Sequence, residues 1–469
     1  MITDFFILLK QELVIVALIF LLLFIRLGKD RDNVQVLNWI NILLLLNFVS
    51  GFFWNKEGML FDQMFVTNKL QFLEKNILNL AVLLISMQSY AWLKTHKHVI
   101  EFYLLLLSAL LGMFLMISGG NLLMFYLGLE LSTIPLAAIV NFDLAKKQSS
   151  EAALKMIISS AFSSCLLLLG ISLVYGIGGT LVFTEIPAHL STNPLQLFAF
   201  VLLISGFAFK ISAVPFHLWT ADVYEGAPVA VTAYLSVVSK AAVLFVFVSV
   251  LYTVFKPLAE AWYQVLVVLS LLTIVTGNLF ALRQNNIKRF LAFSSVSQVG
   301  FILIGISGAS QAGMASVVYF ILVYLFSNLA AFGVISLVSA VAGKENISDY
   351  RSFYSTNPFL SWVLTIALFS LAGVPPAAGF FGKFFLLMSG AAKGNYWLIG
   401  FAALNMVISF YYYLRIVKAI FMDANEMPVA KIAIPVFPKL AFYICIAGIL
   451  VIGLLGSVYD YIFSLSSGL

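Results

Sequence analysis

The sequence contains few charged residues, few cysteines and few histidines. Asp, Glu, Lys and Arg make up only 10% of its 469 residues, whereas soluble globular domains carry about 25%. Cys165 and Cys445 lie far apart in apolar segments and form no CxxC pair, so neither a disulfide framework nor an iron–sulfur site is expected. Because no histidine pair stands at helical spacing with carboxylates, the sequence also predicts no metal site.

Nucleotide-binding and secretory motifs are missing as well. The glycine-rich stretch 175–180 follows an apolar segment rather than a strand, so we interpret it as a connecting turn and not as a nucleotide site. The first apolar run lacks a small-residue cleavage site and follows Asp4 and Glu12, which predicts a retained first helix. We therefore expect no cofactor in this chain and no nucleic acid partner, and we assign any redox chemistry to partner proteins.

Hydrophobic residues, at 62% of the chain, are abundant. Long apolar runs predict an all-α polytopic membrane protein with about fourteen transmembrane helices, which begin near Leu13, Val36, Ile77, Val99, Asn121, Glu151, Leu195, Pro228, Trp262, Ile287, Ala312, Phe359, Tyr396 and Leu440. The connection 55–76 holds phenylalanines among polar residues and is too polar to span. We expect it to form an extended or hairpin segment on the membrane surface.

Basic residues are distributed unequally between the two sets of loops. One set holds sixteen: Arg26, Lys29, Arg31, Lys94, Lys97, Lys146, Lys147, Arg283, Lys288, Arg289, Lys344, Arg351, Arg415, Lys418, Lys431 and Lys439. The other set, on the side of the N-terminus, holds six: Lys10, Lys56, Lys69, Lys75, Lys256 and Lys393. The positive-inside rule then predicts that the first set is cytoplasmic and that both termini lie on the outer, periplasmic side of the inner membrane.

Two apolar helices are interrupted by proline at related positions. Val214-Pro215 recurs as Val374-Pro375, 160 residues or about five helix-plus-loop units later. Since five is odd, the second copy is inserted upside down, which is a transporter architecture. The prolines also leave backbone carbonyls without their helical donors, namely those of Ile211, Leu371 and Ala372. A kink that serves packing alone is the alternative interpretation.

The repeat suggests four parts. They are an N-terminal three-helix segment (1–97), a first five-helix repeat (98–257), a second, inverted five-helix repeat (258–422) and a C-terminal helix (423–469).

Charged side chains inside the apolar spans are candidate functional residues, because burying a charge in a membrane is costly. Glu130 is the one acidic residue placed well away from loops and helix ends, and Lys210 and Lys155 are its candidate partners. Lysine suits a proton relay because burial favours its neutral form while a nearby carboxylate favours its charged form. The candidate relay lysines are Lys155, Lys210, Lys240 and Lys383. Snorkelling or static ion pairing is the alternative, above all for Lys155 near a helix end.

Two weaker candidates lie close to these lysines. His217 follows Lys210 by seven residues, but the intervening Pro215 disturbs the helical phase, so relay and plain packing stay equally open. Polar side chains could hold water between Lys240 and Lys383, although serines also allow close helix packing. These side chains are Ser294, Ser295, Ser297, Tyr324 and Asn328.

The stretch FKISAVPFHLWTADVYEGAP at 209–228 closely resembles the broken seventh helix of the antiporter-like subunits of respiratory complex I. Its DVYEGAP ending is similar to that of the NADH–quinone oxidoreductase subunit N family, which is subunit 2 in mitochondria. The resemblance extends over about 101–413. Family members commonly have proline where this chain has Ala221.

The resemblance implies a proton-translocating subunit of NADH:quinone oxidoreductase, driven by quinone reduction in other subunits. It pairs Glu130 with Lys210, assigns Lys240 to the central relay and assigns Lys383 to the connection toward the outer exit. The implied partners are neighbouring antiporter-like subunits, small membrane subunits and the lipid bilayer. The alternatives are a subunit of a multisubunit cation/proton antiporter and a membrane scaffold that transports nothing.

Overall fold

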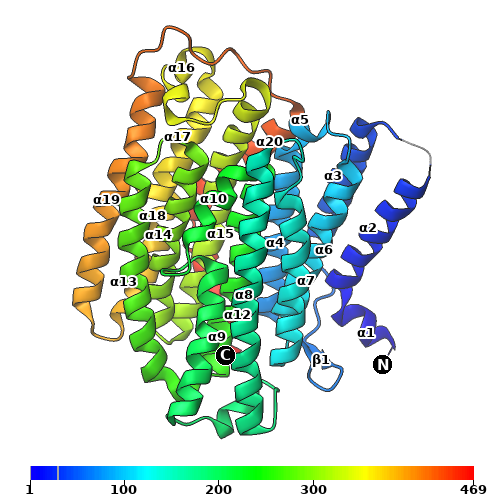
Figure 1. Cartoon of the computed structure of the whole chain (residues 1–469), viewed down its shortest axis with the longest axis vertical. Coiled ribbons are helices and arrows are strands. Elements are labelled where there is room, and N and C mark those ends of the chain that lie inside the picture. The colour runs from blue at the N-terminus through cyan, green and yellow to red at the C-terminus, as the bar shows by residue number, and fades with distance from the viewer. Residues whose placement is uncertain (1, 29–30, 469) are drawn as a thin grey trace.

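The computed structural model describes residues 2–28 and 31–468 as a bundle of long helices that run along a common axis (Figure 1). Within these residues, twelve helical segments are long and apolar enough to cross a membrane. They contain α3 (Asn33–Ser50), α4 (Lys69–Gln88), α6 (Val99–Ile117), α7 (Leu122–Val140), α8 (Lys147–Gly178), α9 (Pro194–Ile211), α11 (Val229–Tyr234) with α12 (Lys240–Thr253), α13 (Ala259–Arg283), α14 (Ile287–Ser307), α15 (Gln311–Ala342), α19 (Tyr396–Phe421) and α20 (Val436–Leu454).

Two further segments bring the spans to the expected fourteen. They are α2 (Lys10–Leu27), which carries three charged residues, and the pair α17 (Pro358–Ala372) and α18 (Ala378–Ala391), in which each helix is too short to span alone. The shorter helices are α1 (Ile2–Leu8), α5 (Tyr90–Leu93), α10 (Leu218–Gly226), α16 (Phe353–Thr356) and α21 (Ser457–Leu465). Single turns complete the chain: η1 (Ile186–His189), the π-helical η2 (Leu235–Ser239), η3 (Lys256–Leu258), η4 (Ile347–Tyr350) and η5 (Ser466–Gly468).

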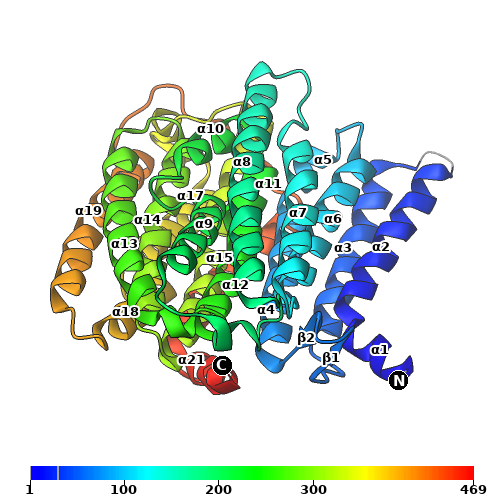
Figure 2. The ribbon, with the colours of Figure 1, turned by 60° about the horizontal axis from the view of Figure 1, so that its bottom comes forward.

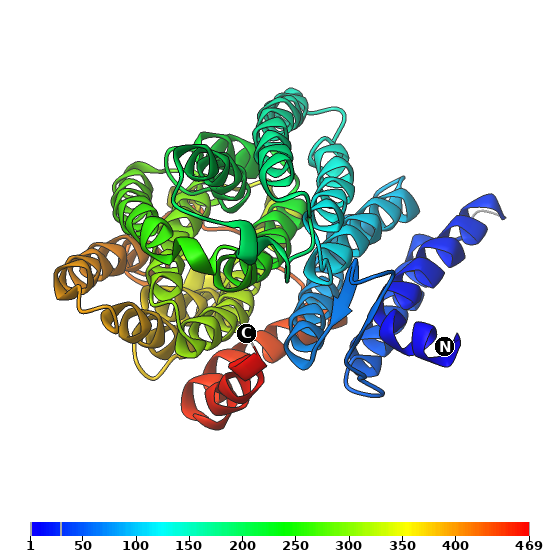
Figure 3. The ribbon, with the colours of Figure 1, turned by 90° about the horizontal axis from the view of Figure 1, so that it is seen from below.

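Both ends of the described chain lie at the same end of the bundle (Figure 2), as an even number of crossings requires. We call this end the terminal face; it also carries the loop between α8 and α9. The other end, with the loops at Lys146 and Lys344, is the opposite face. Seen from the terminal face, the N-terminal helices (dark blue) form one edge of the molecule and α19 (orange) lies at the other (Figure 3).

The helices differ in how much of their surface is buried. α14 and α15 are almost entirely buried, as are α12 and most of α4, and α4 packs against both α12 and α15. α8, α13 and α19 instead expose large apolar side chains such as Phe162, Val268 and Val407. Apolar surface of this extent on long helices is suited to lipid rather than to water. Of the charged side chains discussed below, Lys240 and Lys75 lie on these buried helices.

The connection 55–76 is only partly the surface hairpin that the sequence predicts. β1 (Gly58–Leu60) pairs antiparallel with β2 (Phe65–Thr67), which confirms the hairpin. The rest of the prediction is wrong, because α4 begins at Lys69 after a capping box formed by Asn68 and Gln71. Lys75 therefore lies inside a helix, where it is fully buried against Glu12. Removing it from the loops makes the count of basic residues sixteen to five, so the bias persists.

The two proline-broken segments occupy equivalent places in two sets of helices. In each set a 32-residue helix, α8 or α15, packs against a broken pair, α9 and α10 or α17 and α18. The preceding helices α7 and α14 both start after a capping asparagine, and each asparagine also forms an isolated bridge, Asn121 with Val182 and Asn286 with Asn346. Five crossings separate the copies, so they start from opposite faces. The expected fold class is confirmed, while the boundaries 1–97, 98–257, 258–422 and 423–469 stay a prediction.

Candidate functional site

Both broken helices stop in the interior of the bundle. α9 ends at Ile211, where Ser212 takes a left-handed conformation (φ 65°), and α10 begins at Leu218. α17 ends at Ala372, where Gly373 takes a left-handed conformation (φ 87°), and α18 begins at Ala378. Irregular backbone at this depth is tolerated only where protein or a water-filled space satisfies it. Each break is therefore a place where polar groups can gather.

At the second break, Lys383 occupies the carbonyls that the prolines release. Its Nζ donates to the carbonyl oxygens of Leu371 at 2.8 Å and Ala372 at 3.3 Å. Gln298 Nε2 on α14 donates to the same Leu371 oxygen at 3.0 Å. Side chains thus occupy the Leu371 and Ala372 carbonyls, two of the three that lose a helical donor to proline. Lys383 is almost completely buried and lies 5.1 Å from the centre of the Phe301 ring.

At the first break, Lys210 is surrounded by hydroxyl groups. Its Nζ donates to Thr133 Oγ1 at 2.8 Å and to Ser160 Oγ at 2.7 Å. Glu130 lies one turn from Thr133 on α7, and Glu130 Oε1 accepts a hydrogen bond from Ser164 at 2.5 Å. Ser164 in turn lies one turn from Ser160 on α8. No direct Glu130–Lys210 ion pair forms in the described part of the chain. Instead, the hydroxyls of Thr133 on α7 and of Ser160 and Ser164 on α8 lie between the two side chains.

Lys240 lies near the middle of its span. It follows Val229 by 11 residues and precedes Thr253 by 13, which corresponds to about 17 Å and about 20 Å of helix. Its Nζ donates to Ser295 Oγ at 2.7 Å and lies 5.4 Å from the centre of the Tyr224 ring. Within residues 2–28 and 31–468 no carboxylate pairs with it. The π-turn η2 directly precedes Lys240, and such turns are frequent at functional sites. No pattern in the sequence predicted this turn.

Neutral polar side chains on α14 extend from Lys240 toward Lys383. Gln298 lies one turn beyond Ser295 and donates to the hydroxyl of Tyr413 at 3.1 Å as well as to the carbonyl that binds Lys383. Ser294 and the Tyr413 hydroxyl lie 2.5 Å apart. The polar connection therefore contains Ser294 and Ser295, as the sequence suggested. Gln298 and Tyr413 were not predicted. Charged residues stand out in an apolar span because burying a charge there is costly, and a neutral polar side chain lacks this signal.

The other suggested polar residues have different partners. Ser297 donates to Asn278 Oδ1 at 2.7 Å, which joins α14 to α13. The Tyr324 hydroxyl lies 3.0 Å from that of Ser236, on the π-turn before Lys240. Asn328 Nδ2 is buried and has no partner among the described residues. Ser297 therefore belongs to a helix–helix contact rather than to the connection between the lysines.

Lys155 and His217 lie apart from this polar connection. Lys155 Nζ lies 2.7 Å from Asp222 and 2.7 Å from Glu151, and 44% of its side chain is exposed. It is therefore held at the surface by Asp222, which Arg289 also binds at 2.7 Å, and it is not the partner of Glu130. His217 is buried, and neither of its ring nitrogens has a partner among the described residues.

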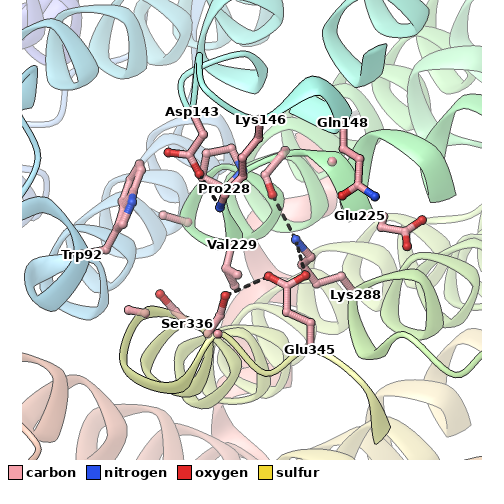
Figure 4. Close-up of a pocket in the computed structure, with 16 residues that line it drawn as sticks. Trp92, Asp143, Lys146, Gln148, Glu225, Pro228, Val229, Lys288, Ser336 and Glu345 are labelled. Carbon is pink, nitrogen blue, oxygen red and sulfur yellow. Dashed lines mark hydrogen bonds and ion pairs between the residues drawn. The ribbon is translucent and has the colours of Figure 1, made fainter. Parts of the chain in front are cut away.

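A polar cavity opens on the opposite face close to the start of α11 (Figure 4). Its volume is about 430 Å³, and Glu225, Pro228, Lys288 and Glu345 contribute to its lining. Lys288 pairs with Glu345 at 2.9 Å, and Ser339 Oγ donates to the same carboxylate at 2.8 Å. Glu225 directly follows Tyr224, whose ring lies near the Lys240 amine. The cavity thus approaches Lys240 from the opposite face.

A half-buried lysine at one break and a buried lysine at the other, in two pseudo-symmetric helices, define a polytopic membrane protein of the ion-translocating class. Residues 119–409 match the family model described as NADH:quinone oxidoreductase/Mrp antiporter, transmembrane. NADH-quinone oxidoreductase subunit N of Phocaeicola vulgatus is 47% identical over 424 residues, covering 89% of each chain. The same subunit of Azobacteroides pseudotrichonymphae is 44% identical, covering 99% of this chain and 98% of that one.

Solved structures show the same architecture. A chain of respiratory complex I from Thermus thermophilus superimposes with a TM-score of 0.80 at 27% identity, covering 96% of this chain and 97% of that one. A chain of the Mrp complex from Dietzia sp. superimposes with a TM-score of 0.85 at 19% identity, covering 99% and 97%, which shows a shared fold alone. The chain belongs to the NADH-quinone oxidoreductase subunit N family.

Proposed function

We propose that this chain is a proton-translocating, antiporter-like subunit of respiratory complex I. The observation that carries the proposal is a set of proton-binding side chains, the half-buried Glu130 and Lys210 and the buried Lys240 and Lys383, that hydroxyl, amide and carbonyl groups join or approach. Hydroxyls both donate and accept hydrogen bonds, so they can pass a proton in either direction. A scaffold has no need of uncompensated amines at this depth, where each costs about 2.5–3.5 kcal/mol.

In this proposal, protons enter from the cavity on the opposite face and reach Lys240 past Tyr224. Lys210, controlled by the charge of Glu130 through the intervening hydroxyls, sets when Lys240 is loaded. Lys240 then passes its proton along Ser295, Gln298 and Tyr413 toward Lys383. Gaps between these groups would be filled by water when the subunit is active. Lys155 serves as part of a static ion-pair network and not as a relay.

The bias of basic residues toward the opposite face supports an orientation with that face in the cytoplasm and both termini on the periplasmic side of the inner membrane. Quinone reduction elsewhere in the complex would supply the energy, and this chain would hold no redox centre. Its partners would be the neighbouring antiporter-like and small membrane subunits. The relatives named NADH-quinone oxidoreductase subunit N support membership in such a complex.

Lys240→Arg tests the relay. Arginine keeps the positive charge in roughly the same place but does not deprotonate in proteins, since its pKa lies above about 12. If Lys240 releases its proton in each cycle, the variant assembles but translocates few protons. The measurement is the number of protons moved per NADH oxidised in membrane vesicles, normalised to the amount of assembled complex.

Lys155→Arg is the matched control. It is the same substitution on an exposed lysine that already sits in ion pairs, so its pumping should equal that of the unmodified chain. Near-normal pumping with arginine at position 240 would overturn the relay role of Lys240 and favour a static charge.

A further inference from the structure

The terminal face carries a second cavity that the proposed route does not use. Its volume is about 420 Å³, and it lies between α4, the end of α6, the loop before η1 and the last turns of α12. Polar side chains contribute to its lining, namely Gln63, Asn68, Gln71, Glu74, Thr184, Ser249 and Thr253. We call this cavity the terminal vestibule. A hollow of this size that offers these polar groups can hold several waters.

Glu74 is the charged side chain of the terminal vestibule. It is only 4% exposed although it lines the cavity. Among the described residues, no basic side chain forms an ion pair with it and no group donates a hydrogen bond to its carboxylate. The adjacent Lys75 points elsewhere, toward Glu12 and the rings of Phe65 and Phe114. A buried carboxylate without a protein partner must bind water or a proton.

The floor of the vestibule lies on the helix that carries Lys240. Phe245 and Val246 line its deep end, and Ser249 and Thr253 line it nearer the terminal face. Phe245 follows Lys240 by five residues, which is about 7.5 Å of helix rise. This length corresponds to a few hydrogen-bonded waters. α4 packs directly against α12, so Glu74 and the outer half of the Lys240 helix border the same space.

We propose that Glu74 is a proton-transfer residue that gives Lys240 a direct route to the terminal face. When water passes Phe245 and Val246, the Lys240 ammonium loses a proton to this water chain and becomes neutral. The Glu74 carboxylate takes the proton up and becomes a neutral acid. It then releases the proton to water in the vestibule and is again a carboxylate. This inference rests on the proposed function of Lys240.

The first test replaces the carboxylate while keeping its shape. Glu74→Gln should assemble and translocate fewer protons per NADH, because a positioned proton-transfer group contributes about 10²–10⁴-fold to the rate of its step. Glu74→Asp keeps a carboxylate and should retain most of the pumping. Glu185→Gln is the control, since Glu185 is an exposed carboxylate in the loop next to the vestibule, and it should pump normally. All values are taken per assembled complex, so partial assembly does not obscure the comparison.

Normal pumping by Glu74→Gln, or equal loss in Glu74→Gln and Glu74→Asp, would overturn the role of Glu74. Lys240→Arg measured in parallel separates this failure from failure of the proposed function. If Lys240→Arg is defective while Glu74→Gln is normal, the relay stands and the Glu74 route falls. If Lys240→Arg is also normal, the proposed function falls with it.

The second test asks whether the vestibule is open to water. Ser249→Cys is introduced after the native Cys165 and Cys445 are replaced, and the complex is treated with a membrane-impermeant thiol reagent from the terminal face. Ser249 lines the vestibule, whereas Val243, on the same helix, is buried and does not. We expect Ser249→Cys to react and Val243→Cys to stay unmodified. An unreactive Ser249→Cys would overturn the hydrated route.

Discussion

The buried ion pair between Lys75 and Glu12 permits a quantitative test of how the N-terminal helices are held. The Lys75 side chain is fully buried and that of Glu12 is 4% exposed. Breaking a pair of this kind by removing one partner costs about 3–5 kcal/mol, because the other charge is left uncompensated. Glu12→Gln should therefore destabilise the protein by this amount, which is about 10²- to 10³-fold or more in the unfolding equilibrium.

Removing both charges should have the opposite result. A buried ion pair that is replaced by apolar side chains of similar volume is often neutral or stabilising. The double variant Glu12→Leu/Lys75→Met should therefore recover most or all of the stability that Glu12→Gln loses. Lys75 also lies over the rings of Phe65 and Phe114, at 5.2 and 5.9 Å from their centres, where a methionine side chain can pack.

The assay is equilibrium unfolding in mixed detergent micelles, with the exposed Lys56–Asp4 pair as the control. That pair has a separation of 2.5 Å, but its side chains are 55% and 43% exposed. Lys56→Met should therefore change the free energy of unfolding by about 0.2–1 kcal/mol at most. A loss of less than about 1 kcal/mol in Glu12→Gln would refute uncompensated burial as the dominant cost. A double variant no more stable than Glu12→Gln would refute the recovery.

Three further predictions concern the relay, the second break and the orientation. Glu130→Gln should lower coupled proton pumping in vesicles while the complex still assembles, and full coupling would show that the charge is not needed. Gly379→Ala should reduce assembly, because the added Cβ would lie 1.7 Å from the Ser370 carbonyl oxygen and overpacking costs about 1–3 kcal/mol; Gly400→Ala, with open space around it, should be harmless. A reporter active only outside the cytoplasm should work after Leu469 and be silent between Lys146 and Lys147; the reverse pattern would invert the topology.

The sequence predicts the spans and the breaks well because both depend on local chemistry. A long apolar run is stable as a helix that spans the membrane. A proline inside such a run removes a helical hydrogen bond whatever the surrounding tertiary structure. Lys240 and Lys383 were identifiable for the same reason, as charges in apolar surroundings. The release of the Leu371 and Ala372 carbonyls by Pro375 and Pro376 follows from the same local argument.

The features that the sequence analysis missed depend on distant parts of the chain. Glu74 and Lys75 lie in a polar stretch that looks like a loop, and Lys75 acquires its partner from Glu12, 63 residues earlier. Gln298 and Tyr413 are separated by 115 residues and become neighbours only through the packing of α14 and α19. No local pattern marks either pair, so only the tertiary structure shows them.

The structure sorts the buried and half-buried lysines by the chemistry of their partners. Lys75 and Lys288 are each paired with a carboxylate, which supplies a fixed counter-charge. Lys240 and Lys383 are held instead by hydroxyl and carbonyl oxygens, with no carboxylate paired to them in the described residues. Such neutral acceptors provide much less compensation for a positive charge than a carboxylate does. The lysines proposed to move protons are thus the ones that the chain has left without a permanent counter-charge.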